Sequence, residues 1–158
     1  MTIRWKPHVT VAAIIETDGR FLLVEEHTPN GLRLNNPAGH LDPGESPLQG
    51  CAREALEETG FQFAPEFLVG IYLAQSMQTT YLRFAFGGTL GSFDKDRILD
   101  EGIVRTLWLT AEEIRKSAHL LRSPMLLRGI DDYLLGKRYP LDLIYTDNSI
   151  FTPSTELS

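Results

Sequence analysis

The chain has 158 residues, of which 42% are hydrophobic and 23% charged, and this composition is ordinary for a globular domain. Its net charge of −6 at pH 7 excludes general binding to nucleic-acid polymers or anionic membranes, since both require a basic face, and no apolar run approaches the roughly 18 residues of a membrane span. The single Cys51 and an N-terminus without signal-peptide features predict a cytoplasmic protein.

The first part of the chain predicts strands followed by a helix. Segments 8–16 and 21–26 are β-branched and apolar, and the Thr-Asp-Gly-Arg stretch between them predicts a hairpin turn. The polar segment 27–36 contains Pro, Asn and Gly in succession and predicts a loop. A helix is expected at about 47–58.

The second part predicts three strands and then two helices. The strands are expected over 66–76, 80–90 and 103–109. Thr110 and Glu113 form a capping box that opens a short helix, and Ser123-Pro124 opens a second one that ends near Gly136.

This order of elements predicts an α/β fold with one mixed sheet between helices. We expect a single domain over residues 1–146 and a loose C-terminal tail over residues 147–158.

The predicted central helix has an unusual concentration of acids. Ser46, Pro47 and Gly60 mark its two ends. Glu54, Glu57 and Glu58 share the face opposite its apolar stripe and lie toward its negative end. Their mutual repulsion costs a few tenths of a kcal/mol per pair, and the macrodipole adds about 0.3–1 kcal/mol for each acid in the last turn. Two interpretations follow from these acids alone: a solvated helix end, or a site for a hard divalent cation such as Mg²⁺.

A longer pattern surrounds these acids and carries a family resemblance. It comprises Gly39, Glu45, Arg53-Glu54-Ala55, Glu57-Glu58 and Gly60-Phe61. The spacing G-x5-E-x7-R-E-U-x-E-E-x-G-U resembles the Nudix box at every fixed position, and Ala55 at the aliphatic position is the only soft match. Segments outside the box resemble the NudJ-type phosphatase branch of this family, namely 6–12, 21–26, 36–41, 82–86, 108–114, 121–124 and 136–144.

The resemblance implies a Nudix fold and hydrolysis of a phosphoanhydride. It implies that Glu57 and Glu58 are the main Mg²⁺ ligands, with Mn²⁺ as an alternative ion. It also implies that Glu54 is a ligand or the base acting on water, and that the Gly39 carbonyl adds a ligand. Arg53 and Glu45 would form a supporting ion pair that positions the acids.

The NudJ-type branch further implies a broad range of small substrates. These are nucleoside di- and triphosphates, thiamine diphosphate and hydroxymethylpyrimidine diphosphate, with release of orthophosphate rather than pyrophosphate. The chain is expected to act as a monomer or a homodimer.

Further candidate residues lie outside the acidic helix. A further ligand or base is expected from the loop before the last strand, with Glu101 as the first choice and Asp100 as the second, and an exposed acidic loop is the alternative. Arg83, His40 and Arg33 are candidates for substrate contacts. Residues expected to be structural or on the surface are His8, His27, His119 and Cys51, and those with a ring-stacking alternative are Tyr72, Tyr81 and Trp5.

Two other functions remain open at this point. A non-catalytic Nudix module would bind a nucleotide or a protein partner, but such modules are expected to lose acids of the box. An isomerase of isoprenoid diphosphates shares the fold implied here, yet no residue outside the box supports it.

Overall fold

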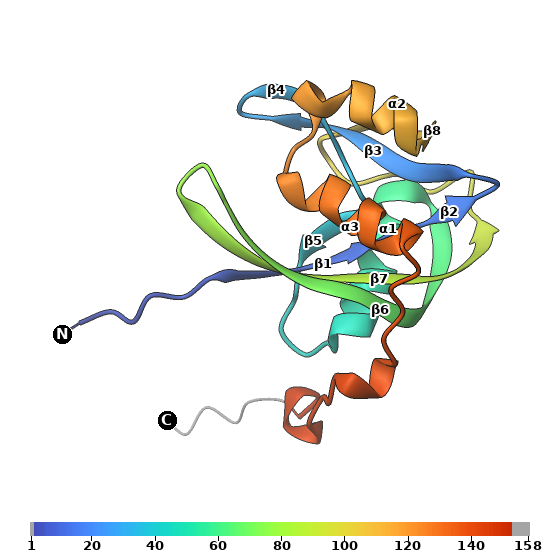
Figure 1. Cartoon of the computed structure of the whole chain (residues 1–158). Coiled ribbons are helices and arrows are strands. Elements are labelled where there is room, and N and C mark those ends of the chain that lie inside the picture. Colours follow the sequence, from blue (N-terminus) through green and yellow to red (C-terminus); the bar gives the residue numbers. More distant parts are fainter. Residues whose placement is uncertain (1, 153–158) are drawn as a thin grey trace.

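The computed structural model describes residues 2–152 as two four-stranded sheets with three helices (Figure 1). The first sheet has the order β5 (Ala38–His40), β1 (His8–Ala13), β7 (Thr79–Phe93), β6 (Phe61–Ser76). The second contains β2 (Glu16–Thr17), β3 (Arg20–Thr28), β4 (Gly31–Asn35) and β8 (Ile103–Thr110), which pairs with β3. The helices are α1 (Pro47–Thr59), α2 (Ala111–Lys116) and α3 (Pro124–Leu134).

Strand β1 shows why the α/β class is confirmed. It pairs in parallel with β7 and antiparallel with β5, so the sheet is mixed. Its residues alternate between two hydrophobic clusters, as a strand buried on both faces requires. Val11 and Ala13 pack with Cys51 of α1, whereas Ala12 and Ile14, which directly follows the strand, pack with Leu126 of α3. The sheet is therefore covered by helices on both sides.

The strands form two sheets and not the predicted single sheet, because the predicted strand over 8–16 is divided between β1 in one sheet and the start of β2 in the other. The predicted turn at Asp18-Gly19 is present, with positive φ at both residues, and it joins β2 to β3. Strand β1 lies before this hairpin and pairs within the other sheet.

The prediction of a loop over 27–36 is wrong. Strand β3 continues to Thr28 and pairs with β4 across a tight turn. The Thr28 hydroxyl accepts from the Asn30 N–H at 3.2 Å and donates to the Gly31 carbonyl at 2.7 Å, and Gly31 has φ +92°. The polar residues that suggested a loop belong to this turn and to a half-exposed strand.

Strands β6 and β7 form a long hairpin that projects from the body of the molecule in Figure 1. Its tip, Met77-Gln78, has positive φ at both residues, as a tight hairpin turn requires. The predicted tail over 147–158 contains one 3₁₀ turn, Asn148–Ile150, and another, Leu141–Leu143, precedes it, while residues 153–158 lie outside the described part. Among residues 2–152, no helix has the length and apolar character needed to cross a membrane.

Candidate active site

The acidic helix forms as predicted because its end signals are local. The Ser46 hydroxyl accepts from the Gln49 N–H, and the Gln49 side chain accepts from the Ser46 N–H, which completes the capping box. At the other end Gly60 adopts φ +79°, and its N–H donates to the Leu56 carbonyl at 2.9 Å. Cys51 and Ala55 are fully buried against the sheet, which fixes the orientation of the acidic face.

The acids are not a solvated helix end. Glu54 is 8% exposed and Glu58 is 6% exposed, while Glu57 is only half-buried. Burying carboxylates is costly unless a partner compensates them. The structure therefore favours the second interpretation, in which the acids form part of a site.

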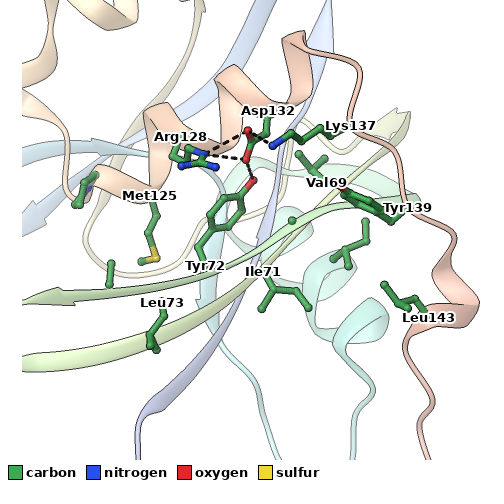
Figure 2. Close-up of a pocket in the computed structure, with 14 residues that line it drawn as sticks. Val69, Ile71, Tyr72, Leu73, Met125, Arg128, Asp132, Lys137, Tyr139 and Leu143 are labelled. Carbon is green, nitrogen blue, oxygen red and sulfur yellow. Dashed lines mark hydrogen bonds and ion pairs between the residues drawn. The ribbon is translucent and has the colours of Figure 1, made fainter.

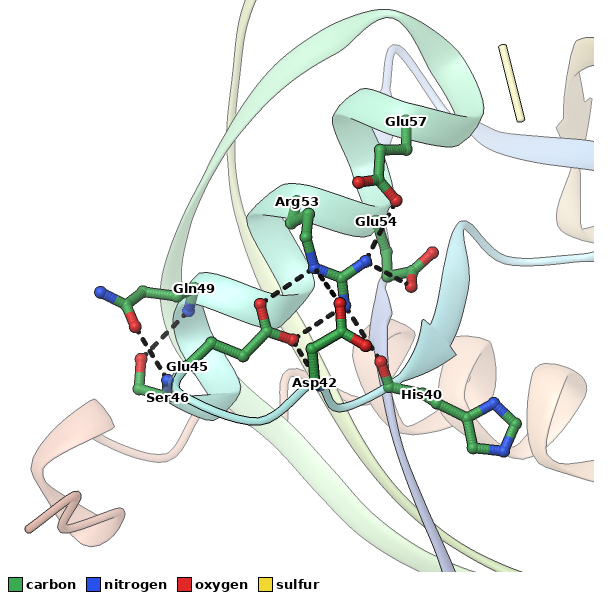
Figure 3. Close-up of polar contacts among 8 residues, drawn as sticks. All are labelled: His40, Asp42, Glu45, Ser46, Gln49, Arg53, Glu54 and Glu57. Carbon is green, nitrogen blue, oxygen red and sulfur yellow. Dashed lines mark hydrogen bonds and ion pairs between the residues drawn. The ribbon is translucent and has the colours of Figure 1, made fainter. Parts of the chain in front are cut away.

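Arg53 is the internal partner of these acids (Figure 3). Its guanidinium donates to both oxygens of Glu45 at 2.8 and 2.9 Å, to Glu54 at 2.8 Å and to Glu57 at 3.0 Å. It also donates to the His40 carbonyl at 3.0 Å. The hydrogen bonds with Glu45 raise the pKa of Arg53 above its usual range. One cation thus holds the helix, the preceding loop and strand β5 in one arrangement.

Two glycines make room for this network. A Cβ at Gly39 would lie 2.2 Å from Oε1 of Glu54, so the carboxylate occupies the space that any side chain there would need. A Cβ at Gly50 would lie 2.8 Å from Oε1 of Glu45. Each glycine therefore permits close approach of a carboxylate. This explains Gly50, since a glycine inside a helix destabilises it by about 1 kcal/mol relative to alanine.

Glu58 has a separate anchor and an altered proton affinity. Its carboxylate accepts from the Ala38 N–H of β5 at 2.7 Å. Burial raises the pKa of the Glu58 carboxyl to about 9, and the Ala38 hydrogen bond offsets this only in part. Burial also raises the pKa of Glu54, against the opposing hydrogen bond from Arg53. Burial therefore raises the proton affinity of both carboxyls, and Glu58 keeps its proton at neutral pH in the metal-free chain.

Carboxylate oxygens converge at the C-terminal end of α1. Atoms of Glu54, Glu57 and Asp100 all lie within 4.8 Å of one another, and the Asp100 N–H donates to the Glu57 carbonyl at 3.0 Å. These hard oxygen donors fit Mg²⁺ or Mn²⁺. The loop before β8 therefore contributes Asp100, the second choice from the sequence, whereas Glu101 lies outside this group.

A cavity of about 390 Å³ opens beside the acids. Glu54 and Glu58 line it, and so do all three predicted substrate-contact residues, Arg83, His40 and Arg33. Several polar residues of its wall were not predicted from the sequence, among them Thr10, Glu26, Asn35 and Arg122. These four residues meet only when the two sheets are brought together, although Thr10, Glu26 and Arg122 lie within segments that resemble the NudJ-type branch.

The arginines of this cavity differ in how their guanidinium groups are paired. Arg122 donates to Glu26 at 2.6 Å, and Asn35 donates to the same carboxylate at 3.3 Å. Arg83 is 5% exposed, and its one hydrogen bond in the described structure goes from Nη2 to Asn35 Oδ1 at 3.3 Å. Burial lowers the pKa of Arg83 to about 10, and the positive charge of Arg122 contributes.

Two residues expected to be structural lie beside His40. His8 and His40 share a ring–ring hydrogen bond of 2.8 Å, and Tyr81 packs edge-on against His8. Burial lowers the pKa of His40, and His8 adds to this effect. By contrast, Cys51 is fully buried, and burial raises the pKa of its thiol, which agrees with a packing role.

A second groove, of about 670 Å³, is lined by residues of β6, of α3 and of the segment that follows α3 (Figure 2). Asp132 accepts from the Tyr72 hydroxyl at 2.8 Å and from Arg128 at 3.1 Å, and it pairs with Lys137 at 3.0 Å. Its polar groups thus satisfy one another, and the metal-ligating cluster lies elsewhere. The cavity beside α1 is therefore the candidate active site.

Comparison with known proteins agrees with this site. The NUDIX domain family matches residues 5–128. Phosphatase NudJ of Shigella boydii is 41% identical over 151 residues, covering 94% of this chain and 97% of the relative, and Phosphatase NudJ of Escherichia coli K12 is 40% identical over the same shares. A NUDIX hydrolase structure from Nitrosomonas europaea is 54% identical with a TM-score of 0.87, covering 90% of this chain and 99% of that one. The predicted resemblance is confirmed, and the chain belongs to the Nudix hydrolase family.

Proposed function

We propose that the chain is a Mg²⁺-dependent phosphohydrolase that releases orthophosphate from small di- and triphosphates. The single observation that carries this proposal is the convergence of Glu54, Glu57 and Asp100 beside a cavity lined by three arginines. The substrates we propose are nucleoside di- and triphosphates, thiamine diphosphate and hydroxymethylpyrimidine diphosphate. Support for this range comes from the relatives named Phosphatase NudJ.

The residues have distinct roles in this proposal. Glu54, Glu57 and Glu58, with the Gly39 carbonyl and Asp100, would hold the ion, and Mn²⁺ could replace Mg²⁺. A bound ion would supply neutralisation of phosphate charge and a lower pKa of bound water. Glu54, whose pKa burial raises, is the candidate for accepting the proton of the attacking water.

Other residues position the acids or bind the substrate. Arg53 and Glu45 set the orientation of the acids, because one guanidinium contacts three of the helix and loop carboxylates. Arg83, Arg33 and His40 contact the substrate from the cavity wall. Glu101 is retained only as a weaker alternative to Asp100. We further propose a single domain over 1–146 that acts in the cytoplasm as a monomer or homodimer.

The test is a panel of these phosphates incubated with Mg²⁺, with the products separated by chromatography. We expect orthophosphate and the substrate shortened by one phosphate. Release of pyrophosphate from triphosphates would contradict the proposed bond, and no turnover of any compound would contradict the proposed function.

A further inference from the structure

A row of polar side chains leads from the edge of the first sheet into the cavity. The strand register places His40 of β5 opposite Thr10 of β1, and Thr10 opposite Arg83 of β7. All three side chains line the cavity. Since neighbouring strands lie about 4.8 Å apart, the Arg83 backbone is roughly 10 Å inward from the edge strand. Glu54 and Glu58 contact that edge strand at Gly39 and Ala38.

The inner end of this row has hydrogen-bond donors that no neighbour satisfies. Thr10 is 6% exposed and Arg83 is 5% exposed. Within the part of the chain that the structure describes, Nε and Nη1 of Arg83 and the Thr10 hydroxyl have no hydrogen-bond partner. Leaving a buried polar group unpaired costs about 1–3 kcal/mol, and more for a charged one. Two such residues side by side indicate that a ligand completes them.

The surrounding acids do not fill this role. Glu26 already accepts from Arg122 at 2.6 Å and from Asn35 at 3.3 Å. Glu58 accepts from the Ala38 N–H at 2.7 Å. The unpaired donors of Arg83 and Thr10 therefore require acceptor oxygens from a ligand that enters through the mouth of the cavity.

We propose that Arg83 and Thr10 form a receptor for an unsubstituted terminal phosphate. This inference rests on the proposed function and deepens it. A phosphate offers several strong acceptor oxygens, and the planar guanidinium fork matches them in geometry and charge. The terminal phosphate is also the part that all proposed substrates share, so a fixed receptor for it is compatible with a broad range of other groups.

This placement fixes the direction in which the substrate lies. The terminal phosphate is at the floor, the anhydride bond is beside the acids of α1, and the variable group points past His40 toward the mouth. Hydrolysis adds one water and yields orthophosphate and the shortened phosphate ester. A diphosphate with a further group esterified to its terminal phosphate cannot enter this way, because Arg83 and Thr10 close the floor.

The direct test compares adenosine diphosphate with adenosine diphosphate ribose, in which a second ribose is esterified to the terminal phosphate. We expect kcat/KM with Mg²⁺ to be at least about 100-fold higher for adenosine diphosphate, because only this compound fills the receptor. Equal hydrolysis of both would overturn the receptor and leave the proposed function intact. Hydrolysis of neither compound, nor of the wider panel, would overturn both.

The Arg83→Met variant tests the residue itself. We expect KM for adenosine diphosphate and the inhibition constant of inorganic phosphate to rise at least about 10-fold. The melting temperature of the metal-free protein should stay equal or rise, because an unpaired buried cation is replaced by an apolar side chain of similar length. The matched control is Arg105→Met, an exposed arginine paired with Glu25 on the other sheet, which should change none of these values.

Two results would overturn this assignment. A lower melting temperature with unchanged KM would make Arg83 a structural residue. Altered preference between adenosine diphosphate and thiamine diphosphate, with unchanged inhibition by phosphate, would show that Arg83 contacts the ring. The milder Thr10→Val variant provides a second readout, since it should raise KM about 2–5-fold while retaining the fold.

Discussion

Arg53 and Arg83 are two largely buried arginines of one site in opposite states. Arg53 donates to three carboxylates and a backbone carbonyl, and its pKa is raised. Arg83 donates only to Asn35 among the described residues, and its pKa is lowered to about 10. The first arginine holds protein groups in place, and the second keeps donors available for a ligand. One site can thus contain two arginines with opposite effects, because Arg53 stabilises the fold and Arg83 costs stability in order to bind a ligand.

Breaking the Arg53 network should have the largest effect. Arg53→Met leaves the buried carboxylate of Glu54 without its partner and the partly buried Glu45 with only the Asp42 N–H, so we expect a stability loss of about 2–3 kcal/mol and a melting temperature lower by about 5–10 °C. Activity should fall by roughly 1,000-fold because the acids lose their orientation. Thermal unfolding and kcat measure the two effects. An unchanged melting temperature would show that Arg53 does not support the fold.

Glu57→Gln should separate catalysis from stability. The variant removes one carboxylate from the convergent group but keeps its size, and its ion pair with Arg53 is worth only about 0.3–0.5 kcal/mol. We expect activity to fall at least about 100-fold, with the melting temperature changed by about 2 °C or less. Full activity in this variant would contradict the assigned role of Glu57 as a metal ligand.

Glu58 should make the metal-free protein less stable as pH rises. Its pKa is about 9 in the folded chain and near 4.5 when unfolded, so the folded state keeps a proton that the unfolded chain loses. This contribution to stability is complete below pH 4.5 and is lost as pH rises through 9. We expect a loss of roughly 2 kcal/mol between pH 5 and 8, because water in the cavity screens part of the full effect.

Chemical denaturation of the chelated protein at several pH values measures this dependence. Glu58→Gln should flatten the curve relative to the natural chain. If both proteins follow the same curve, Glu58 is ionised in the folded state and its proposed proton affinity is wrong.

The smallest effect should come from the loop before β8. Asp100→Asn is expected to weaken Mn²⁺ binding about 10-fold, because Asp100 lies within the convergent group. Glu101→Gln is the matched control and should leave binding within about 2-fold. The reverse order in a calorimetric titration would restore Glu101, the first choice from the sequence.

The parts of the site that could be predicted are those set by local signals. Helix α1 and its acids follow from Ser46, Pro47 and Gly60, which act within one segment. The β3–β4 hairpin was not predicted because the turn residues Pro29, Asn30 and Gly31 and the polar neighbours of Leu32 and Leu34 obscure the short alternation of β4. Asp100 could not be chosen over Glu101 since the decision depends on a hydrogen bond to Glu57.

The polar residues of the cavity wall could not be predicted either, because their role also depends on tertiary structure. Thr10, Asn35 and Arg122 come from three distant segments, and each reads as an ordinary strand or loop residue in the sequence. Only the register between β1 and β7 and the approach of the second sheet bring them beside Arg83.

The central claim is that the acidic end of α1 is one half of a site completed by a divalent cation. Calorimetric titration of Mg²⁺ and Mn²⁺ into protein freed of metal by a chelator, with Glu57→Gln in parallel, measures cation binding without any substrate. We predict saturable binding to the natural chain that is weakened at least about 10-fold in the variant. Equal binding to both proteins, or no binding to the natural chain, would contradict the claim.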